Sequence, residues 1–230
     1  MTVNPAATAA LFEAIRTGDD LAVDVAVAVN EELLRAHDEA GLSSVVAAAS
    51  AGHIRLAERL AARLVKSADG IGFFDAAAIG NVPAVRILLS ADLAAVDDRG
   101  PDGCTALHLA ARFGQMEMAR LLLGRGADPN AISLNDERVT PLYTAVVAKH
   151  RDTATLLLAL GASPNSVQLG GWTALHAAAR NGDQAIVDML QLRGADPTRA
   201  SDDGHTAIAL AEENGHGALA NVLRMASAKR

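Results

Sequence analysis

The chain of 230 residues is 50% hydrophobic but only 3% aromatic, and 27 acidic against 20 basic residues give it a formal net charge of −7. Nucleic-acid binding normally requires a basic face, and no stripe of Lys and Arg with interleaved aromatic residues is present, so a nucleic-acid partner is disfavoured. The single cysteine, Cys104, rules out an internal disulfide and indicates a reducing compartment.

The N-terminal segment from Met1 to Phe12 contains no basic residue and no long apolar run, so it does not predict a secretory signal. No stretch of the sequence approaches the roughly 20 apolar residues that a membrane span needs. We therefore expect a cytoplasmic protein with no membrane partner. The Ala-rich composition is typical of a bacterial source.

The most informative feature is a repeat with a period of about 33 residues. The segment Gly103–Gly114 recurs as Gly171–Gly182, and each copy is followed by Gly-Ala-Asp-Pro. One glycine position can be followed through the whole chain, with Lys149 once in its place: Gly18, Gly52, Gly80, Gly114, Lys149, Gly182 and Gly215. The sequence therefore predicts one domain over 1–230 made of seven repeats, at approximately 6–37, 38–66, 67–99, 100–132, 133–167, 168–200 and 201–226.

The first three repeats are degenerate, whereas the last four are clear. In the third repeat, for example, Phe73–Ala77 stands where the fourth has Leu107–Ala111. The interval from Gly52 to Gly80 is too short for a full hairpin. We expect the first and last repeats to act as caps, because residues such as Glu13 and Glu212 can give end repeats a polar outer face. Capped ends predict a monomer.

Each clear repeat contains the signals of two short helices. In the fourth repeat, Thr105 is a good N-cap, and Gly114 suits the left-handed residue that ends a helix. A second helix is predicted from Met116 to Leu123, with Leu122 in the core. Pro129 prevents its continuation. In the fifth repeat, Pro141 after Thr140 suits the first helical position.

These residues resemble the ankyrin repeat, whose pattern includes Thr-Pro-Leu-His and the ending Gly-Ala-Asp-Pro-Asn, matched in full at Gly126–Asn130. The resemblance covers roughly residues 6–226, and the whole chain also looks like a group of bacterial ankyrin proteins whose first repeats are irregular. Ala replaces the usual Pro at positions such as Ala106, and Tyr143 breaks the Leu-His pair. The resemblance implies an all-α ankyrin-repeat solenoid of stacked helix-turn-helix units with short β-hairpin connections.

The resemblance also implies a non-catalytic scaffold that binds a protein partner through its concave face and hairpin tips. In the family, the residue before Thr and the two residues before the helix-ending Gly usually contact the partner. Transferred position by position, these are Cys104, Arg112 and Phe113; Val139, Val147 and Ala148; Trp172, Arg180 and Asn181; and His205, Glu213 and Asn214.

The segment 131–139 adds candidate residues to this interface, and the roles of Trp172 and Arg180 in it have two interpretations each. The segment 131–139 is two residues longer than its equivalent 166–172, and it carries Ile132, Leu134 and Arg138. It is either a contact point or a tolerated insertion. Trp172 serves either to bind or to cover the hairpin backbone, and Arg180 is either a contact or a solvated helix end. The predicted partner-binding residues are Arg112, Phe113, Ile132, Leu134, Arg138, Val139, Trp172, Arg180, Asn181 and His205.

Sequence motifs for catalysis, cofactors or metals are not found. Gly124-Arg-Gly126 ends a predicted helix, whereas a dinucleotide loop must begin one. Cys104 has no base and orienting residue fixed nearby. In the ankyrin family, His108 and His176 correspond to histidines that hydrogen-bond their own turn and neighbouring backbone. We therefore expect no enzyme, cofactor or metal site; the alternatives are a self-associating structural protein, or a small-molecule binder or enzyme with a deep pocket.

Overall fold

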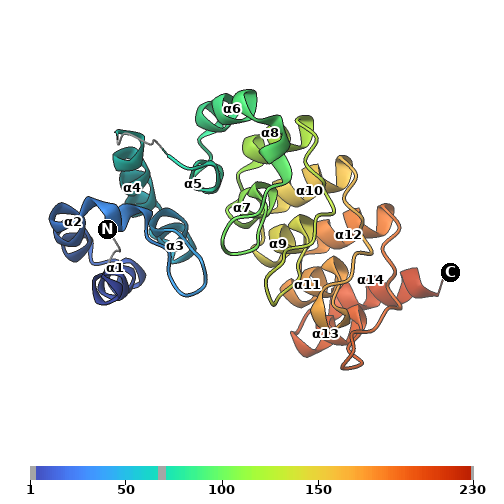
Figure 1. Ribbon diagram of the computed structural model, residues 1–230. Helices are drawn as coiled ribbons and strands as arrows, with labels where there is room; N and C mark the ends of the chain where they lie inside the picture. Colours follow the sequence, from blue (N-terminus) through green and yellow to red (C-terminus); the bar gives the residue numbers. More distant parts are fainter. Residues whose placement is uncertain (1–3, 67–70, 229–230) are drawn as a thin grey trace. The chain divides into compact units, whose positions relative to one another are not determined.

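The computed structural model describes residues 4–66 and 71–228, and within them the regular structure is entirely helical (Figure 1). The α-helices follow one another in pairs: α1 (Pro5–Thr17) and α2 (Asp20–Val29), α3 (Ser44–Ser50) and α4 (Ile54–Lys66), α5 (Phe73–Ala78) and α6 (Val82–Ala91), α7 (Ala106–Arg112) and α8 (Met116–Gly124), α9 (Pro141–Val147) and α10 (Arg151–Ala159), α11 (Ala174–Asn181) and α12 (Gln184–Leu192), and α13 (Ala207–Glu213) and α14 (Gly217–Ser227).

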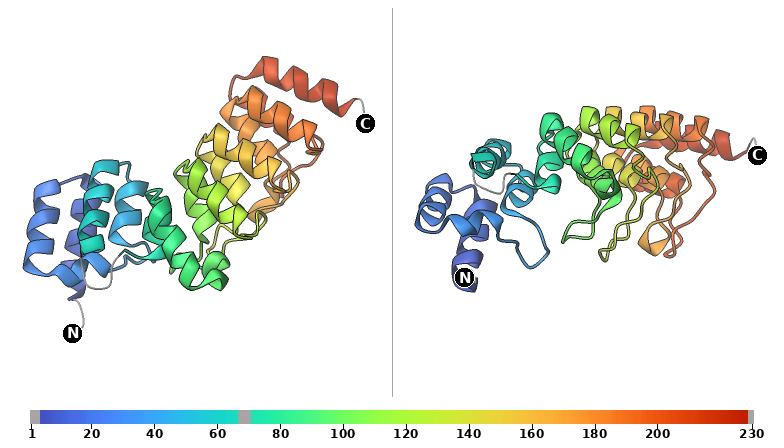
Figure 2. Two further views of the ribbon diagram at one scale, coloured as in Figure 1. Left: turned by 90° about the horizontal axis from the view of Figure 1, so that it is seen from above. Right: turned by 45° about the horizontal axis from the view of Figure 1, so that its top comes forward.

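The chain divides into two compact units, Met1–Ala106 and Leu107–Arg230, called unit 1 and unit 2 below. In unit 2 the first helices of the repeats, α7, α9, α11 and α13, form one row, and the second helices form another row beside it (Figure 2). In unit 1, α1, α3 and α5 pack in the same way, each against its own second helix. The predicted all-α solenoid is thus confirmed, while the description of the whole chain as one domain stays a prediction.

The helix-end signals act as the sequence predicts. Thr140 caps α9 by accepting a hydrogen bond from the backbone N–H of Tyr143, and Pro141 takes the first helical position. Gly182 ends α11 with a φ of 70°. Lys149, which occupies the glycine position of the fifth repeat, has a φ of 63°. The repeat thus imposes the left-handed conformation even where no glycine supplies it.

Hairpins with little regular pairing connect several successive repeats in the described part of the chain. Isolated antiparallel bridges join His37 to Ser43, Arg99 to Thr105, and Ala200 to Thr206. In unit 2, asparagine side chains tie successive turns together. Asn130 donates to the carbonyl of Gly161 and accepts from the backbone N–H of Ser163.

The first and third repeats have short 3₁₀ helices in place of the Gly-Ala-Asp-Pro ending. These helices, η1 (Glu31–Arg35) and η2 (Leu93–Asp97), begin where the side chains of Asn30 and Asp92 accept backbone hydrogen bonds. Asp75 stands in the position that Leu109 holds in the fourth repeat, and it accepts a hydrogen bond from the hydroxyl of Ser43. Burial raises the pKa of Asp75, and the Ser43 hydrogen bond opposes this effect.

The core consists mainly of small aliphatic side chains, as the composition predicts. Leu122 is fully buried, and the observed α8 agrees with the helix predicted from Met116 to Leu123. Cys104 is also fully buried. Because each buried Leu contributes about 1.5–3 kcal/mol, close packing of Ala and Leu stabilises these thin layers with few aromatic side chains such as Phe12.

The predicted junction of the second and third repeats, at positions 67–70, falls outside the described residues. In the first repeat, Glu13 is exposed, as the predicted polar cap requires, and it forms an ion pair with Arg16. The outer helix α2 is less polar than expected, since Leu21 and Val29 are 74% and 83% exposed. No helix in the described part of the chain has the length and apolar character to cross a bilayer.

Candidate protein-binding site

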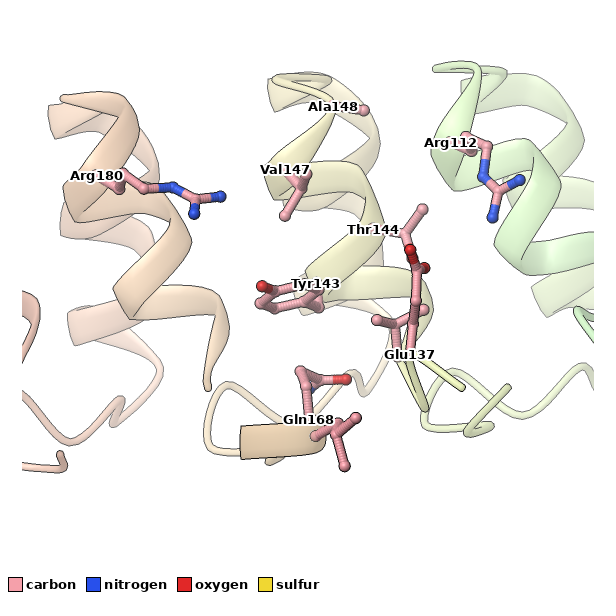
Figure 3. Close-up of a pocket in the computed structure, with 10 residues that line it drawn as sticks. Arg112, Glu137, Tyr143, Thr144, Val147, Ala148, Gln168 and Arg180 are labelled. Carbon is pink, nitrogen blue, oxygen red and sulfur yellow. The ribbon is translucent and has the colours of Figure 1, made fainter. Parts of the chain in front are cut away.

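One pocket in unit 2 gathers side chains from three successive repeats. We call it the Tyr143 pocket; it has a volume of about 560 Å³. It is lined by Arg112, Glu137, Val139, Tyr143, Thr144, Val147, Ala148, Gln168, Leu169 and Arg180. Figure 3 shows Arg180 extending from α11 toward α9, which carries Tyr143, with Arg112 on α7 at the other side of α9 and Glu137 and Gln168 on the hairpin side.

The pocket exists because the fifth repeat lacks the histidine of its neighbours. In the sixth repeat, Nδ1 of His176 accepts a hydrogen bond from the backbone N–H of Thr173, and Nε2 contacts the carbonyl oxygens of Arg199 and His205. Tyr143 occupies the histidine position of the fifth repeat and does not make these bonds.

In the fifth repeat, Gln168 takes over the capping role of the missing imidazole. Its side-chain oxygen accepts from the backbone N–H of Thr140 at 2.8 Å, and its side-chain nitrogen donates to the carbonyl of Ser166. A residue of the next hairpin thus completes the cap of α9. The Tyr143 side chain is released from that task and lines the pocket.

The charge of the pocket is positive, because two guanidinium groups oppose one carboxylate, that of Glu137. Burial raises the pKa of Tyr143, while Arg180 lowers it and Glu137 raises it further. The phenol therefore stays protonated at neutral pH and can donate a hydrogen bond. A pocket with guanidinium and hydroxyl donors above apolar walls can accept an anionic or amide-bearing side chain.

Arg180, which is exposed, lies beside an aromatic cluster around Trp172. The guanidinium carbon of Arg180 lies 6.0 Å from the centre of the indole ring, at the limit of a cation–π contact. The same indole contacts His176 edge-on, with ring centres 5.6 Å apart, and stacks on His205 at 6.2 Å. Trp172 is partly buried. These contacts favour a structural role for Trp172 and place it beside the guanidinium of Arg180.

The structure brings together three of the predicted partner-binding residues, Arg112, Val139 and Arg180. Val139 is only 6% exposed, so most of its surface packs inside the repeat and only a small part faces the pocket. Phe113 is partly buried, although the sequence predicted it to be exposed, and it does not line the pocket. Asn181 donates to the carbonyl of Val146, which ties α11 to α9.

The remaining predicted residues lie elsewhere on unit 2. On the longer hairpin, Leu134 is 74% exposed and Ile132 is 41% exposed. Arg138 is exposed with a φ of 48°, a conformation rare for residues other than glycine. His205 belongs to the Trp172 cluster. The hairpin therefore presents an apolar tip that is separate from the pocket lining.

Groups with potential for chemistry have structural roles where the structure describes them. Nε2 of His108 hydrogen-bonds the carbonyl of Val139, and the prediction of a structural imidazole is confirmed for His108 and His176. His150 contacts the carbonyl of Arg112 at the end of the preceding first helix. Within residues 4–66 and 71–228, no three His, Cys, Asp or Glu side chains are grouped as a metal site requires.

Sequence reasoning missed Tyr143, Thr144, Gln168 and Leu169 as pocket residues. The available signal was the break in the Leu-His pair at Tyr143, which marks a position freed from capping. Gln168 carried no such signal, because its role depends on a hydrogen bond to Thr140 across 28 positions of the chain.

Comparison with known proteins agrees with this architecture. The family profile described as "Ankyrin repeats (3 copies)" matches residues 73–168, and the profile "Ankyrin repeat" matches residues 170–202. The chain is 36% identical over 156 residues to ankyrin repeat and SOCS box protein 3 of Bos taurus, and 35% identical to the human protein of that name.

These similarities cover part of each relative. The matches to the bovine and human proteins include 64% of this chain and 29% and 30% of theirs. A further match, to the ankyrin repeat and KH domain-containing protein mask-1 of Caenorhabditis elegans, has 41% identity over 71 residues, which is 31% of this chain and 3% of that protein. Repeated helix pairs, capped turns and both profile matches lead to one conclusion: the chain belongs to the ankyrin repeat family.

Proposed function

We propose that this protein is a non-catalytic scaffold that binds a protein partner through the first-helix and hairpin side of unit 2. One observation carries the proposal: side chains from three successive repeats converge on the Tyr143 pocket. Ankyrin repeats are protein–protein interaction modules, and proteins of this family generally do not catalyse reactions. A polar-rimmed pocket beside exposed apolar side chains is the surface on which interface anchors act.

The hairpin tip at Leu134 extends this proposed interface. An exposed Leu on a hairpin can insert into an apolar depression of a partner, while Arg112 and Arg180 provide charge at the pocket. Under this proposal the chain acts as a cytoplasmic monomer without a nucleic-acid or membrane partner. The negative net charge of −7 supports the exclusion of nucleic acid.

An affinity-capture experiment with matched variants tests the proposal. We expect a partner protein to be recovered from the native cell by the wild type and by Arg120→Gln, which alters an exposed residue of α8 that pairs with Glu117. Recovery should fall at least about tenfold with the double variant Arg112→Gln/Arg180→Gln. Equal recovery by the double variant would refute the assignment of this face.

Self-association is a second candidate, favoured by a specific stripe on α2. Leu21, Val25 and Val29 are 74%, 55% and 83% exposed and recur every four residues, so they lie along one side of the helix. Size-exclusion chromatography at micromolar concentration separates the two candidates. A dimer that dissociates on Val25→Ser and Val29→Ser would favour assembly, whereas a monomer supports the scaffold.

A further inference from the structure

Two hydrogen-bond donors in the Tyr143 pocket lack acceptors within the described chain. The guanidinium of Arg180 makes no ion pair or hydrogen bond with any described residue, and its contact is the indole of Trp172. The hydroxyl of Tyr143 also makes no hydrogen bond there. By contrast, Arg151 in the same unit pairs with Asp183 at 3.0 Å. An oriented guanidinium and a protonated phenol in one pocket form an incomplete binding site for an oxygen acceptor.

One of these donors, the Arg180 guanidinium, adjoins a cluster of packed rings. Trp172 is fixed by His176 and His205, and Arg180 lies against it. Figure 3 shows the Arg180 side chain reaching from α11 toward α9, on the same side as the Tyr143 ring. Donors oriented by packing lose less conformational freedom when they bind an acceptor.

The charges in the pocket distinguish between possible anions. Two guanidinium groups and the Glu137 carboxylate leave a single net positive charge along the lining. A carboxylate neutralises that charge, whereas a doubly charged phosphate would leave a net negative charge beside the Glu137 carboxylate. The apolar side chains Val147 and Leu169 complete the walls. They suit the methylene groups of an acidic residue and an apolar neighbour.

We propose that the Tyr143 pocket binds the carboxylate side chain of an Asp or Glu in a partner protein, held by the Arg180 guanidinium and the Tyr143 hydroxyl, with an adjacent apolar residue against Val147 and Leu169. The inference rests on the proposed protein-binding function and specifies what this face recognises. The carboxylate accepts one charge-assisted hydrogen bond from Arg180 and one from the phenol.

A random 12-residue peptide library displayed on phage tests this inference on the full chain. It is selected in parallel against the wild type, Arg180→Gln, Tyr143→Phe and the control Arg120→Gln, and unchanged circular dichroism confirms folding. We expect the wild type and the control to enrich peptides with an Asp or Glu beside an apolar residue. Arg180→Gln should lose this preference, and Tyr143→Phe should weaken it.

A selected peptide is then titrated against the fluorescence of Trp172, the single tryptophan of the chain. Its Glu→Gln version should bind about tenfold more weakly, because the charge-assisted bond is lost at a site that remains partly exposed. A phosphoserine version should bind more weakly than the Glu peptide.

The outcomes separate the inference from the proposed function. Enriched peptides without an acidic residue, an unchanged preference with Arg180→Gln, or tighter binding of the phosphoserine peptide would overturn the carboxylate assignment and leave the protein-binding scaffold standing. Failure of all four proteins to enrich any peptide would count against both.

Discussion

Replacing Gly182 by Ala measures how strongly a histidine of the next repeat restrains the end of a first helix. Gly182 has a φ of 70°, and a Cβ at this position would lie 2.5 Å from Cε1 of His216. Gly215, which follows α13, has a φ of 79°, but no heavy atom lies within 4 Å of the corresponding Cβ position. Both Gly182→Ala and Gly215→Ala place a Cβ on a residue with positive φ, so both strain the backbone. Only Gly182→Ala also brings that Cβ against the imidazole of His216.

The expected losses follow from these two terms. A left-handed conformation costs a residue with a Cβ about 1–2 kcal/mol, so Gly215→Ala should lower the free energy of unfolding by about that amount. Overpacking costs a further ~1–3 kcal/mol, so Gly182→Ala should lose about 2–5 kcal/mol. Adding His216→Ala to Gly182→Ala removes the clash, and the double-mutant cycle should show a coupling of about 1–3 kcal/mol.

The assay is urea unfolding followed by the fluorescence of Trp172. This residue is the single tryptophan of the chain and lies two residues before the start of α11. The fluorescence therefore reports on the repeats that carry Gly182 and His216. Equal losses for the two glycine variants, or additive effects of Gly182→Ala and His216→Ala, would show that the imidazole gives way without cost and would refute this reasoning.

Three further predictions concern strain and protonation. Lys149→Gly should stabilise unit 2 by about 1 kcal/mol, because it relieves a left-handed residue with a φ of 63°; an unchanged urea midpoint would contradict this. The pKa of Asp75 is raised by burial from its ordinary 3.8, so the folded state favours the protonated acid and loses stability as pH rises above that value. Asp75→Asn should flatten this dependence and raise stability at neutral pH in urea unfolding followed by circular dichroism; a steeper dependence would oppose it. The pKa of His176 is lowered from 6.5 mainly by burial, so the unfolded state gains the proton first and stability falls as pH drops below 6.5. His176→Asn should reduce that slope in Trp172 fluorescence, and an equal slope in both proteins would assign it to other groups.

The sequence alone determined the repeat, the helix pairs and the helix ends, because these depend on residues close together in the chain. Thr140 and Pro141 start a helix, and Gly182 ends one, whatever the distant packing. Lys149 could be aligned with the glycine position from spacing alone. The position of Arg180 near the surface shared with Arg112 also followed from its place two residues before Gly182.

Only the tertiary structure decided what those positions do. Trp172 stacks on His205, and Val139 is buried, because neighbouring hairpins close over them. The Tyr143 side chain lines a pocket because Gln168, in the following repeat, completes the cap that a histidine supplies elsewhere. The sequence period shows which residues occupy the same position within each repeat. The Tyr143 pocket instead depends on side chains from three repeats that come together when the repeats pack against one another.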